Sequence, residues 1–297
     1  MRYEIRLAQK GETLRQKEIW KDCFGDSDQF IDFFYATRYK EDATALLLQD
    51  GEILAMLTML PIKLITPDLQ SIPSTMLYAI ATHPQYQHRG LATQLMNFSH
   101  KYLAEHNTPC SVLVPADQQL FAFYHKQGYQ EGFDIRETLY HPENIEPQIS
   151  DKATRGFISG ITPVLYNQRR NKLLSGKLYI AYPDEDIAYQ KKLSQLSGAD
   201  IYSIEIGEMQ GCAVIERVNA DKVFIKELLM EEELLPVAIH LIAQLLPAKE
   251  YFIRTPAFLG KNLDGSTCRP LGMLKINSPV DVPVTAQAMG YLGLAFD

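Results

Sequence analysis

The sequence predicts a mixed α/β (α+β) protein that is divided into two domains. Its 297 residues exceed the typical domain of roughly 100–150 residues. Helical and strand-like patterns alternate along the chain, which favours a sheet covered by helices. The order of helices, three strands, a helix and a strand occurs between Glu12 and Val114 and again after Ile161, so we expect a duplicated fold.

The composition excludes several classes of protein. The chain is 46% hydrophobic and 22% charged, which is ordinary for a globular protein. A net charge of −7 and a pI near 5.6 argue against binding to nucleic acid or to an anionic membrane. The first residues lack the apolar core of a secretory signal, and no run approaches the roughly 20 apolar residues of a membrane helix.

Cysteine and histidine usage indicates a reducing compartment and no metal centre. The four cysteines are scattered without a CxxC pair, and the seven histidines form no HExxH motif. We therefore expect a cytoplasmic protein with reduced thiols and no structural zinc.

Helix and strand patterns in the first half can be assigned in order. Helical spacing over Glu12–Phe24 ends at Gly25, and Ser27 is placed to cap a second helix over Asp28–Tyr39. The Asp50-Gly51 pair predicts a hairpin turn. Strands are expected at Tyr3–Leu7, Thr44–Leu48, Ile53–Ile65, Thr75–Thr82 and Cys110–Val114, and further helices at Leu91–Ala104 and Gln118–Lys126.

The polar stretch His141–Thr154 predicts a linker between the domains, with a long surface loop as the alternative. After it the same order of patterns begins again. Helices are expected at Ile161–Leu174, Glu185–Leu196 and Leu234–Leu246, and strands at Ile201–Ile206, Cys212–Arg217, Val223–Leu229 and Tyr251–Arg254.

The segment most informative about function is Thr75–Ala92, a strand followed by a turn and a long helix. A helix begins with unpaired backbone N–H groups and a partial positive charge. Gly90 and Ala92 keep the side chains small there, and Arg89 adds a fixed charge, so a diphosphate could approach these amides. Ordinary turn chemistry is the alternative. Neither GxxxxGK[ST] nor GxGxxG occurs, which excludes a Walker A loop and a Rossmann fingerprint.

The run IATHPQYQHRGLA resembles motif A of the GNAT superfamily of acyl-CoA-dependent N-acetyltransferases, in which an apolar-x-Pro run precedes Q/R-x-x-G-x-G/A. Pro84, Gln87, Gly90 and Ala92 match that pattern. The run FYHKQGY, at Phe123–Tyr129, is similar to motif B. The resemblance covers about residues 1–135. The tandem layout is similar to acetyltransferases of the enhanced-intracellular-survival type, although this chain is too short for their further carrier-like domain.

The resemblance implies a GNAT fold with a mixed central sheet flanked by helices. A catalytic domain over 1–140 and a degenerate GNAT-like domain without a coenzyme A loop over 150–297 are expected. The first would bind acetyl-CoA as co-substrate, with a β-bulge splaying its motif-A strand. The residues implied in binding are Ile80, Ala81 and Thr82 for the pantetheine arm, Gln87 at the first motif position, and His88, Arg89, Gly90, Leu91, Ala92 and Thr93 for the pyrophosphate.

Tyr124 is the candidate general acid, because the resemblance places it near the thioester sulfur and a tyrosine stays protonated at neutral pH. Its spacing with Leu120 and Phe121 equally fits a core face. The motif-A strand carries no carboxylate to serve as the base. Asp297 is the candidate base, since the C-terminal carboxylate reaches the site in proteins of the enhanced-intracellular-survival type. The alternatives are that the terminus is not held in place, or that a chain of water molecules takes the proton. Tyr78 is expected to line the acceptor site.

The second half lacks the features that would hold a diphosphate. Its corresponding junction, Met230–Pro236, contains three Glu and no Gly, so we expect it to repel pyrophosphate and to frame the acceptor site or an interface instead. In the first half, acidic residues gather at Asp22, Asp26, Asp28 and Asp32. They suggest a cationic acceptor or, alternatively, a solvated acidic face.

These features together predict transfer of an acetyl group from its coenzyme A thioester to a small-molecule or peptide amine, by direct attack in a ternary complex. No Ser or Cys nucleophile lies in a fitting motif, and Cys110 is expected in the core. A homo-oligomer is possible. One alternative is a non-catalytic acyl-CoA-binding regulator. Another, disfavoured by the acidic pI, is an aminoacyl-tRNA-dependent transferase.

Overall fold

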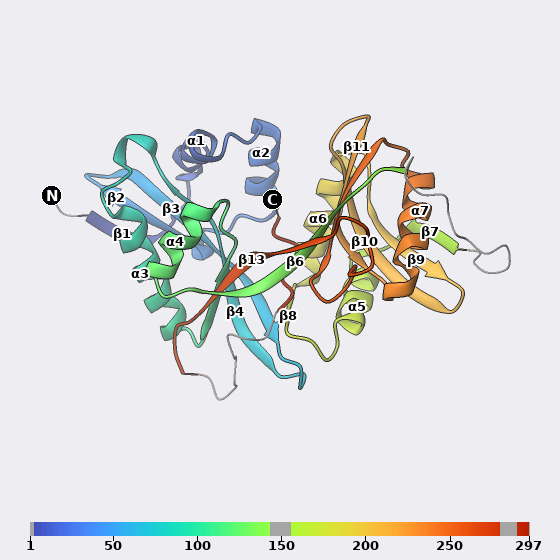
Figure 1. Cartoon of the computed structure of the whole chain (residues 1–297). Coiled ribbons are helices and arrows are strands. Elements are labelled where there is room, and N and C mark those ends of the chain that lie inside the picture. Colours follow the sequence, from blue (N-terminus) through green and yellow to red (C-terminus); the bar gives the residue numbers. More distant parts are fainter. Residues whose placement is uncertain (1–2, 143–155, 280–289, 297) are drawn as a thin grey trace. The chain divides into compact units, whose positions relative to one another are not determined.

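Two compact units make up the structure, a computed structural model that describes residues 3–142, 156–279 and 290–296. Unit 1 contains the described residues up to Leu64, the segment Ser71–Gln130 and the described stretch that starts at Met273. Unit 2 contains Ile65–Gln70, Glu131–Gly272 and the C-terminal stretch. Each unit is a mixed sheet with helices on both faces, so the predicted fold class is confirmed (Figure 1).

In unit 1 the strands lie in the order β1-β2-β3-β4-β5-β13. The elements of unit 1 are β1 (Tyr3–Leu7), α1 (Thr13–Phe24), α2 (Asp28–Thr37), β2 (Thr44–Gln49), β3 (Glu52–Ile65), β4 (Ser71–Thr82), α3 (Leu91–Glu105), β5 (Cys110–Leu113), α4 (Gln118–Lys126) and the end of β13 (Thr267–Ile276). One apolar cluster joins the sheet to α3 and α4.

The local signals of the first half act as expected. Gly25 ends α1 in the left-handed conformation, with φ 72°. The Ser27 side chain caps α2 by accepting a hydrogen bond from the backbone N–H of Phe30. Asp50 and Gly51 both have positive φ, which two-residue hairpins with the right-handed strand twist require.

Unit 2 repeats this order of elements. Its strands lie in the order β6-β12-β11-β10-β9-β7. The elements of unit 2 are β6 (Gln130–Tyr140), β7 (Gly156–Gly160), α5 (Pro163–Leu173), β8 (Tyr179–Ala181), α6 (Asp184–Leu196), β9 (Ile201–Ile206), β10 (Met209–Arg217), β11 (Lys222–Leu229), α7 (Leu235–Leu245) and β12 (Glu250–Pro256). The antiparallel pair β9–β10 and the parallel pair β11–β12 repeat the pairs β2–β3 and β4–β5 of unit 1.

Each unit uses a strand from the other half of the sequence. The end of β13 pairs with β5 in unit 1, from Met273 opposite Leu113 to Ile276 opposite Cys110. Strand β6 pairs with β12 in unit 2, from Ile135 opposite Pro256 to Tyr140 opposite Tyr251. The units therefore differ from the expected ranges 1–140 and 150–297. Most of the expected linker lies outside the described residues.

A sealed polar cluster fixes the C-terminal segment within unit 2. Arg170 of α5 and Glu227 of β11 form an ion pair at 2.9 Å, and both side chains are fully buried. Arg170 also donates to the carbonyls of Ile180 (2.7 Å) and Leu292 (3.1 Å). The ring of Phe296 packs edge-on against Tyr182 at 5.2 Å. The segment up to Phe296 is thus part of the core of unit 2.

Candidate functional site

The parting of β4 from β5 opens the centre of the candidate site in unit 1. The two strands are parallel and pair from Ser74–Cys110 to Met76–Val112; among the described residues their pairing goes no further. Strand β4 continues from Leu77 to Thr82 beside β3, with no described pairing on the edge that faced β5. Unpaired strand edges present N–H and C=O groups to which an extended ligand can bond as an added strand.

Ala79 interrupts β4 with a left-handed backbone, at φ 49°. An L-residue in this conformation costs about 1–2 kcal/mol, so the surrounding structure must impose it. One left-handed residue within a strand is a signature of a β-bulge, which bends the strand. The geometry therefore fits the bulge that the motif-A resemblance implies, at the residue before Ile80.

The three residues expected to bind pantetheine lie along this unpaired edge. Ala81 is buried, whereas Ile80 and Thr82 are partly exposed. The carbonyl of Thr82 accepts hydrogen bonds from the Gln87 side chain (3.1 Å) and from the Cys23 thiol (3.2 Å). Gln87 thus fixes the turn to the strand. Sequence reasoning missed Cys23, which is 59 residues away from Thr82 and has no motif around it.

The turn between β4 and α3 presents backbone amides to solvent. A short 3-10 helix, Pro84–Tyr86, leads into Gln87–Gly90, all of which are exposed. His88 and Gly90 have positive φ, 61° and 73°, and Gly90 is the N-cap of α3. The first backbone bond of α3 runs from Gln94 N–H to Gly90 C=O. The N–H groups of Leu91, Ala92 and Thr93 are therefore left for an anion.

A glycine is favoured at position 90 because the backbone there has a positive φ, and not because neighbouring atoms leave no room for a side chain. A Cβ built on Gly90 meets no heavy atom within 4 Å, so the space beside it is open. Arg89 lies across this turn, with its guanidinium 5.1 Å from the Tyr86 ring centroid and donating to the Gln85 carbonyl at 3.2 Å. The residues present fit a diphosphate: open space, unpaired amides and an exposed cation meet at the start of one helix.

Tyr124 of α4 lies in the same apolar cluster as Leu77 of β4 and Leu91 of α3, with Ile80 packed against that cluster. Its ring is 7% exposed, and burial raises the pKa of Tyr124 to about 12. The hydroxyl forms no hydrogen bond with the described residues and is not among the sealed, unpaired polar atoms. The ring is thus a core element, as the apolar spacing suggested, while the hydroxyl stays accessible.

A polar network holds motif B behind Tyr124. The Tyr129 hydroxyl lies 2.9 Å from His100 Nε2 and 2.8 Å from Ser111 Oγ. Lys275 of β13 donates to the Gln127 carbonyl at 2.7 Å and lies 3.2 Å from His100 Nδ1. Burial and the nearby Lys275 charge lower the pKa of His100 to about 4. His100 is therefore neutral in the folded protein at pH 7.

We expect His100 to make stability depend on pH below neutrality. The unfolded chain binds a proton at His100 near pH 6.5, whereas the folded chain does so only near pH 4. Stability is therefore present above pH 6.5 and is lost as the pH falls toward 4, by up to about 3 kcal/mol. Denaturant unfolding from pH 4 to pH 8 measures this loss. In His100→Gln the free energy of unfolding should fall less steeply between pH 6.5 and pH 4. If it falls equally steeply in both proteins, His100 is not the cause of the loss.

The four acidic residues of the first helix pair already have partners. Asp26 accepts from Trp20 Nε1 at 2.7 Å, while Asp28 pairs with Lys21 and Asp32 with Lys17, each at 2.7 Å. Asp22 lies 3.8 Å from His83. This favours the solvated acidic face. Tyr78 of β4 packs 5.6 Å from Phe34, and the buried Arg38 guanidinium lies 5.9 Å from its ring centroid.

The corresponding junction in unit 2 is built differently. Strand β11 ends at Leu229, a 3-10 helix spans Glu232–Leu234, and α7 begins at Leu235. The Glu232 carboxylate accepts hydrogen bonds from the backbone N–H groups of Gly260 (2.6 Å) and Asn262 (3.0 Å). Asp297, the candidate base, lies outside the described residues.

The described part of the chain contains neither a membrane-spanning helix nor a cluster of metal ligands. No described helix has the length and apolar character to span a bilayer. Nor do three or more His, Cys, Asp or Glu side chains of these residues converge as a metal site would require.

Comparison with known proteins agrees with the motifs. Residues 4–132 match the family described as "Acetyltransferase (GNAT) domain". No protein of curated function matches the sequence. The fold is similar to that of a GCN5-related N-acetyltransferase from Anabaena variabilis ATCC 29413, at TM-score 0.74 and 17% identity over 93% of this chain and 73% of that one.

Two further solved structures share the fold. Eis1 from Mycobacterium abscessus matches at TM-score 0.68 and 12% identity, over 93% of this chain and 74% of its own. A tandem GNAT protein from the clavulanic acid biosynthesis pathway matches at TM-score 0.56 and 11% identity, over 94% of this chain and 100% of its own. Residues 4–132 thus match the GNAT acetyltransferase domain, and the chain shares the fold of solved GNAT proteins.

Proposed function

We propose that the protein transfers an acetyl group from acetyl-CoA to an amine. The observation that carries this proposal is the meeting, in unit 1, of the unpaired β4 edge with the free amides at the start of α3. The β4 edge would bind the pantetheine arm, and the amides from His88 to Thr93 would bind the diphosphate. The family match over 4–132 supports the same assignment.

The reaction would be direct acyl transfer. The neutral amine attacks the thioester carbonyl, the C–S bond of the tetrahedral intermediate breaks, and the amine nitrogen loses one proton. Holding the two substrates together supplies several kcal/mol of the barrier reduction. A backbone N–H on the splayed part of β4 would stabilise the oxyanion. The thiolate, whose conjugate acid has a pKa near 8.5, would accept a hydrogen bond from the Tyr124 hydroxyl.

Tyr124 suits hydrogen-bond donation better than complete proton transfer. With a pKa of about 12 its phenol remains neutral over the whole physiological range. The same value makes it a weaker acid than the departing thiol, so the proton need not leave the oxygen. This refines the general-acid role. Asp297 remains the proposed base, and Asp297→Asn tests whether its side-chain carboxylate takes the amine proton.

Tyr124→Phe should lower kcat about 100-fold while leaving the KM for acetyl-CoA unchanged. The phenyl ring keeps its packing, and the lost hydroxyl has no hydrogen bond to the described residues. Steady-state kinetics by thiol release measure both constants. Tyr129→Phe is the matched control, because its buried hydroxyl is bonded to Ser111 and His100, so it should lose stability and keep most of kcat. An unchanged kcat in Tyr124→Phe would contradict the role.

The test of the function is an acceptor screen. Purified protein is incubated with acetyl-CoA and polyamines, aminoglycosides, amino acids or peptides, while free thiol and acetylated product are measured together. Matched release of thiol and product supports the proposal. The absence of a carboxylate on the free part of β4 favours one other candidate, an acyl-CoA-binding regulator. Saturable acetyl-CoA binding without thiol release over the whole panel would favour that candidate.

A further inference from the structure

A cavity of about 790 Å³ lies entirely within unit 2. It is found where β11 and β12 end. These parallel strands pair from Lys222–Glu250 to Ile225–Ile253, and their described pairing stops there although the strands continue to Leu229 and Pro256. Crevices at the carboxyl ends of parting parallel strands are preferred ligand sites in α/β sheets, and the volume suits a small organic molecule.

One wall of this cavity is the loop that follows β12, and it is held rigidly. Arg136 donates to the carbonyls of Leu259 (2.9 Å) and Ala257 (3.1 Å). Glu232 fixes the next residues by accepting from the N–H groups of Gly260 and Asn262. A loop fixed by two charged side chains needs little further ordering when a ligand binds.

The opposite wall is the end of α5, and it is fixed as well. Arg169 donates to the Gly211 carbonyl at 3.1 Å and to Ser203 Oγ at 2.5 Å, and lies 3.6 Å from Glu205. Its charge is therefore already compensated. Leu173, one turn further along α5, lines the cavity together with Leu229 and Leu259. Between its two walls the cavity thus has an apolar middle.

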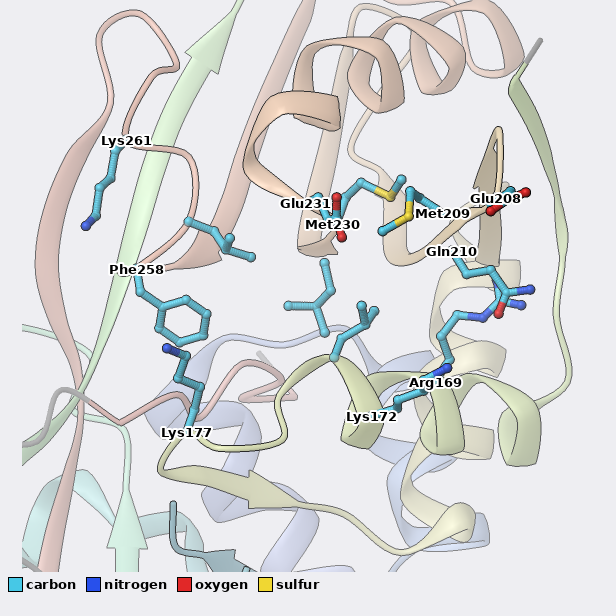
Figure 2. A pocket seen from close by; sticks show the side chains of 13 residues that line it. Arg169, Lys172, Lys177, Glu208, Met209, Gln210, Met230, Glu231, Phe258 and Lys261 are labelled. Atoms are coloured by element: carbon cyan, nitrogen blue, oxygen red, sulfur yellow. The ribbon is translucent and has the colours of Figure 1, made fainter. Parts of the chain in front are cut away.

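Two of the three lysines that line the cavity, Lys177 and Lys261, lie at one end of it, and the third, Lys172, lies on the α5 wall (Figure 2). Figure 2 shows Lys177 with its amine beside the Phe258 ring and Lys261 on the same side, with Glu208 on the far side. The Lys177 nitrogen lies 5.0 Å from the Phe258 ring centroid. The side-chain amines of Lys177 and Lys261 form no hydrogen bond or ion pair with the described residues. Two exposed ammonium groups thus border an apolar space without a carboxylate partner.

We propose that this cavity binds an organic anion with an unbranched apolar body and one anionic head group. The head group, a carboxylate or a phosphate monoester, lies between Lys177 and Lys261, and the body lies against Leu173, Leu229 and Leu259. Glu231 also lines the cavity, which opposes the several negative charges of coenzyme A. The site is therefore distinct in ligand and in place from the acetyl-CoA site proposed in unit 1.

The test is calorimetry with octanoate and with octyl phosphate, below their micelle concentrations, on full-length protein saturated with coenzyme A. Coenzyme A is present so that an acyl site in unit 1 does not contribute. Octanol and octylamine, which share the chain but lack the negative charge, are the matched ligands. The matched proteins are the double variant Lys177→Gln/Lys261→Gln and Lys192→Gln, an exposed lysine of α6 outside the cavity.

At least one anion should bind saturably, with affinity reduced at least about tenfold in the double variant and unchanged in Lys192→Gln. The stronger of the two anions identifies the head group. Leu173→Trp, which places a larger side chain in the cavity, should also reduce binding. The proposal is overturned if neither anion binds, if octylamine or octanol binds as well as the anions, or if the double variant binds the anions as tightly as the wild type.

Discussion

Gly90→Glu is expected to weaken coenzyme A binding by at least about 100-fold and to abolish acetyl transfer while the chain stays folded. The new carboxylate would stand in the open space beside the amides of Leu91, Ala92 and Thr93. There it would repel the diphosphate and compete for the same N–H donors. Calorimetry with coenzyme A measures the loss.

Backbone strain must be separated from this effect, because Gly90 has φ 73°. Gly198, in unit 2, has φ 85° and likewise no heavy atom within 4 Å of a built Cβ. Gly198→Glu therefore adds the same charge and similar strain away from the motif, and should bind coenzyme A as the wild type does. Gly90→Ala should bind with an intermediate affinity. Equal binding by Gly90→Glu and Gly198→Glu would show that the turn does not hold the diphosphate.

Arg170→Met is expected to destabilise the protein by about 3–5 kcal/mol. It leaves the Glu227 carboxylate fully buried without its cation, with the Tyr166 hydroxyl at 2.9 Å as a remaining donor. It also removes the donors to the carbonyls of Ile180 and Leu292, which tie the C-terminal segment to α5. Thermal unfolding should show the midpoint lowered by roughly 10 °C.

Two further variants identify the cause of that loss. Arg170→Met/Glu227→Leu removes both charges and should recover part of the stability, because a buried pair is harmful chiefly when one partner is left alone. Lys101→Met breaks an exposed pair with Glu105, at 3.8 Å, and should cost less than about 1 kcal/mol. If Arg170→Met lowers the free energy of unfolding no more than Lys101→Met does, the buried cluster does not stabilise unit 2.

Local signals explain why much of the fold could be predicted. The Ser27 cap, the left-handed Gly25 and the Asp50-Gly51 turn each depend on neighbours within a few residues. The strand–turn–helix of motif A is also local, so its backbone could be anticipated from the Gln87–Ala92 pattern. The repeated order of elements followed from the hydrophobic spacing alone.

Four strands of the described chain, β6, β7, β8 and β13, were not predicted, and two of them show why. In β13 the pattern is interrupted by Pro270 and Gly272, which normally argue against a strand. In β6 the charged residue Glu137 occupies the strand interior, and its charge is tolerated because Arg254 (3.0 Å) and Arg269 (2.6 Å) pair with it. Such compensation comes from residues more than one hundred positions away, so no local reading could supply it.

The candidate site was predictable where it is made of backbone and unpredictable where it depends on tertiary contacts. The left-handed backbone of Gly90 and the unpaired amides after it follow from the way a helix begins. The contacts of Cys23 with Thr82 and of Arg38 with Tyr78 join distant segments and belong to no motif. The cavity of unit 2 is of the same kind, because Lys177 and Lys261 meet only after folding.

Calorimetric titration of the wild-type chain with coenzyme A tests the central claim most directly. We expect saturable binding of one molecule per chain, because unit 1 offers free amides at Gly90–Thr93 whereas the matching junction of unit 2 presents glutamates. Two molecules per chain would contradict the assignment of unit 2. Absence of saturable heat, with no rise in the melting temperature, would contradict the proposed site in unit 1.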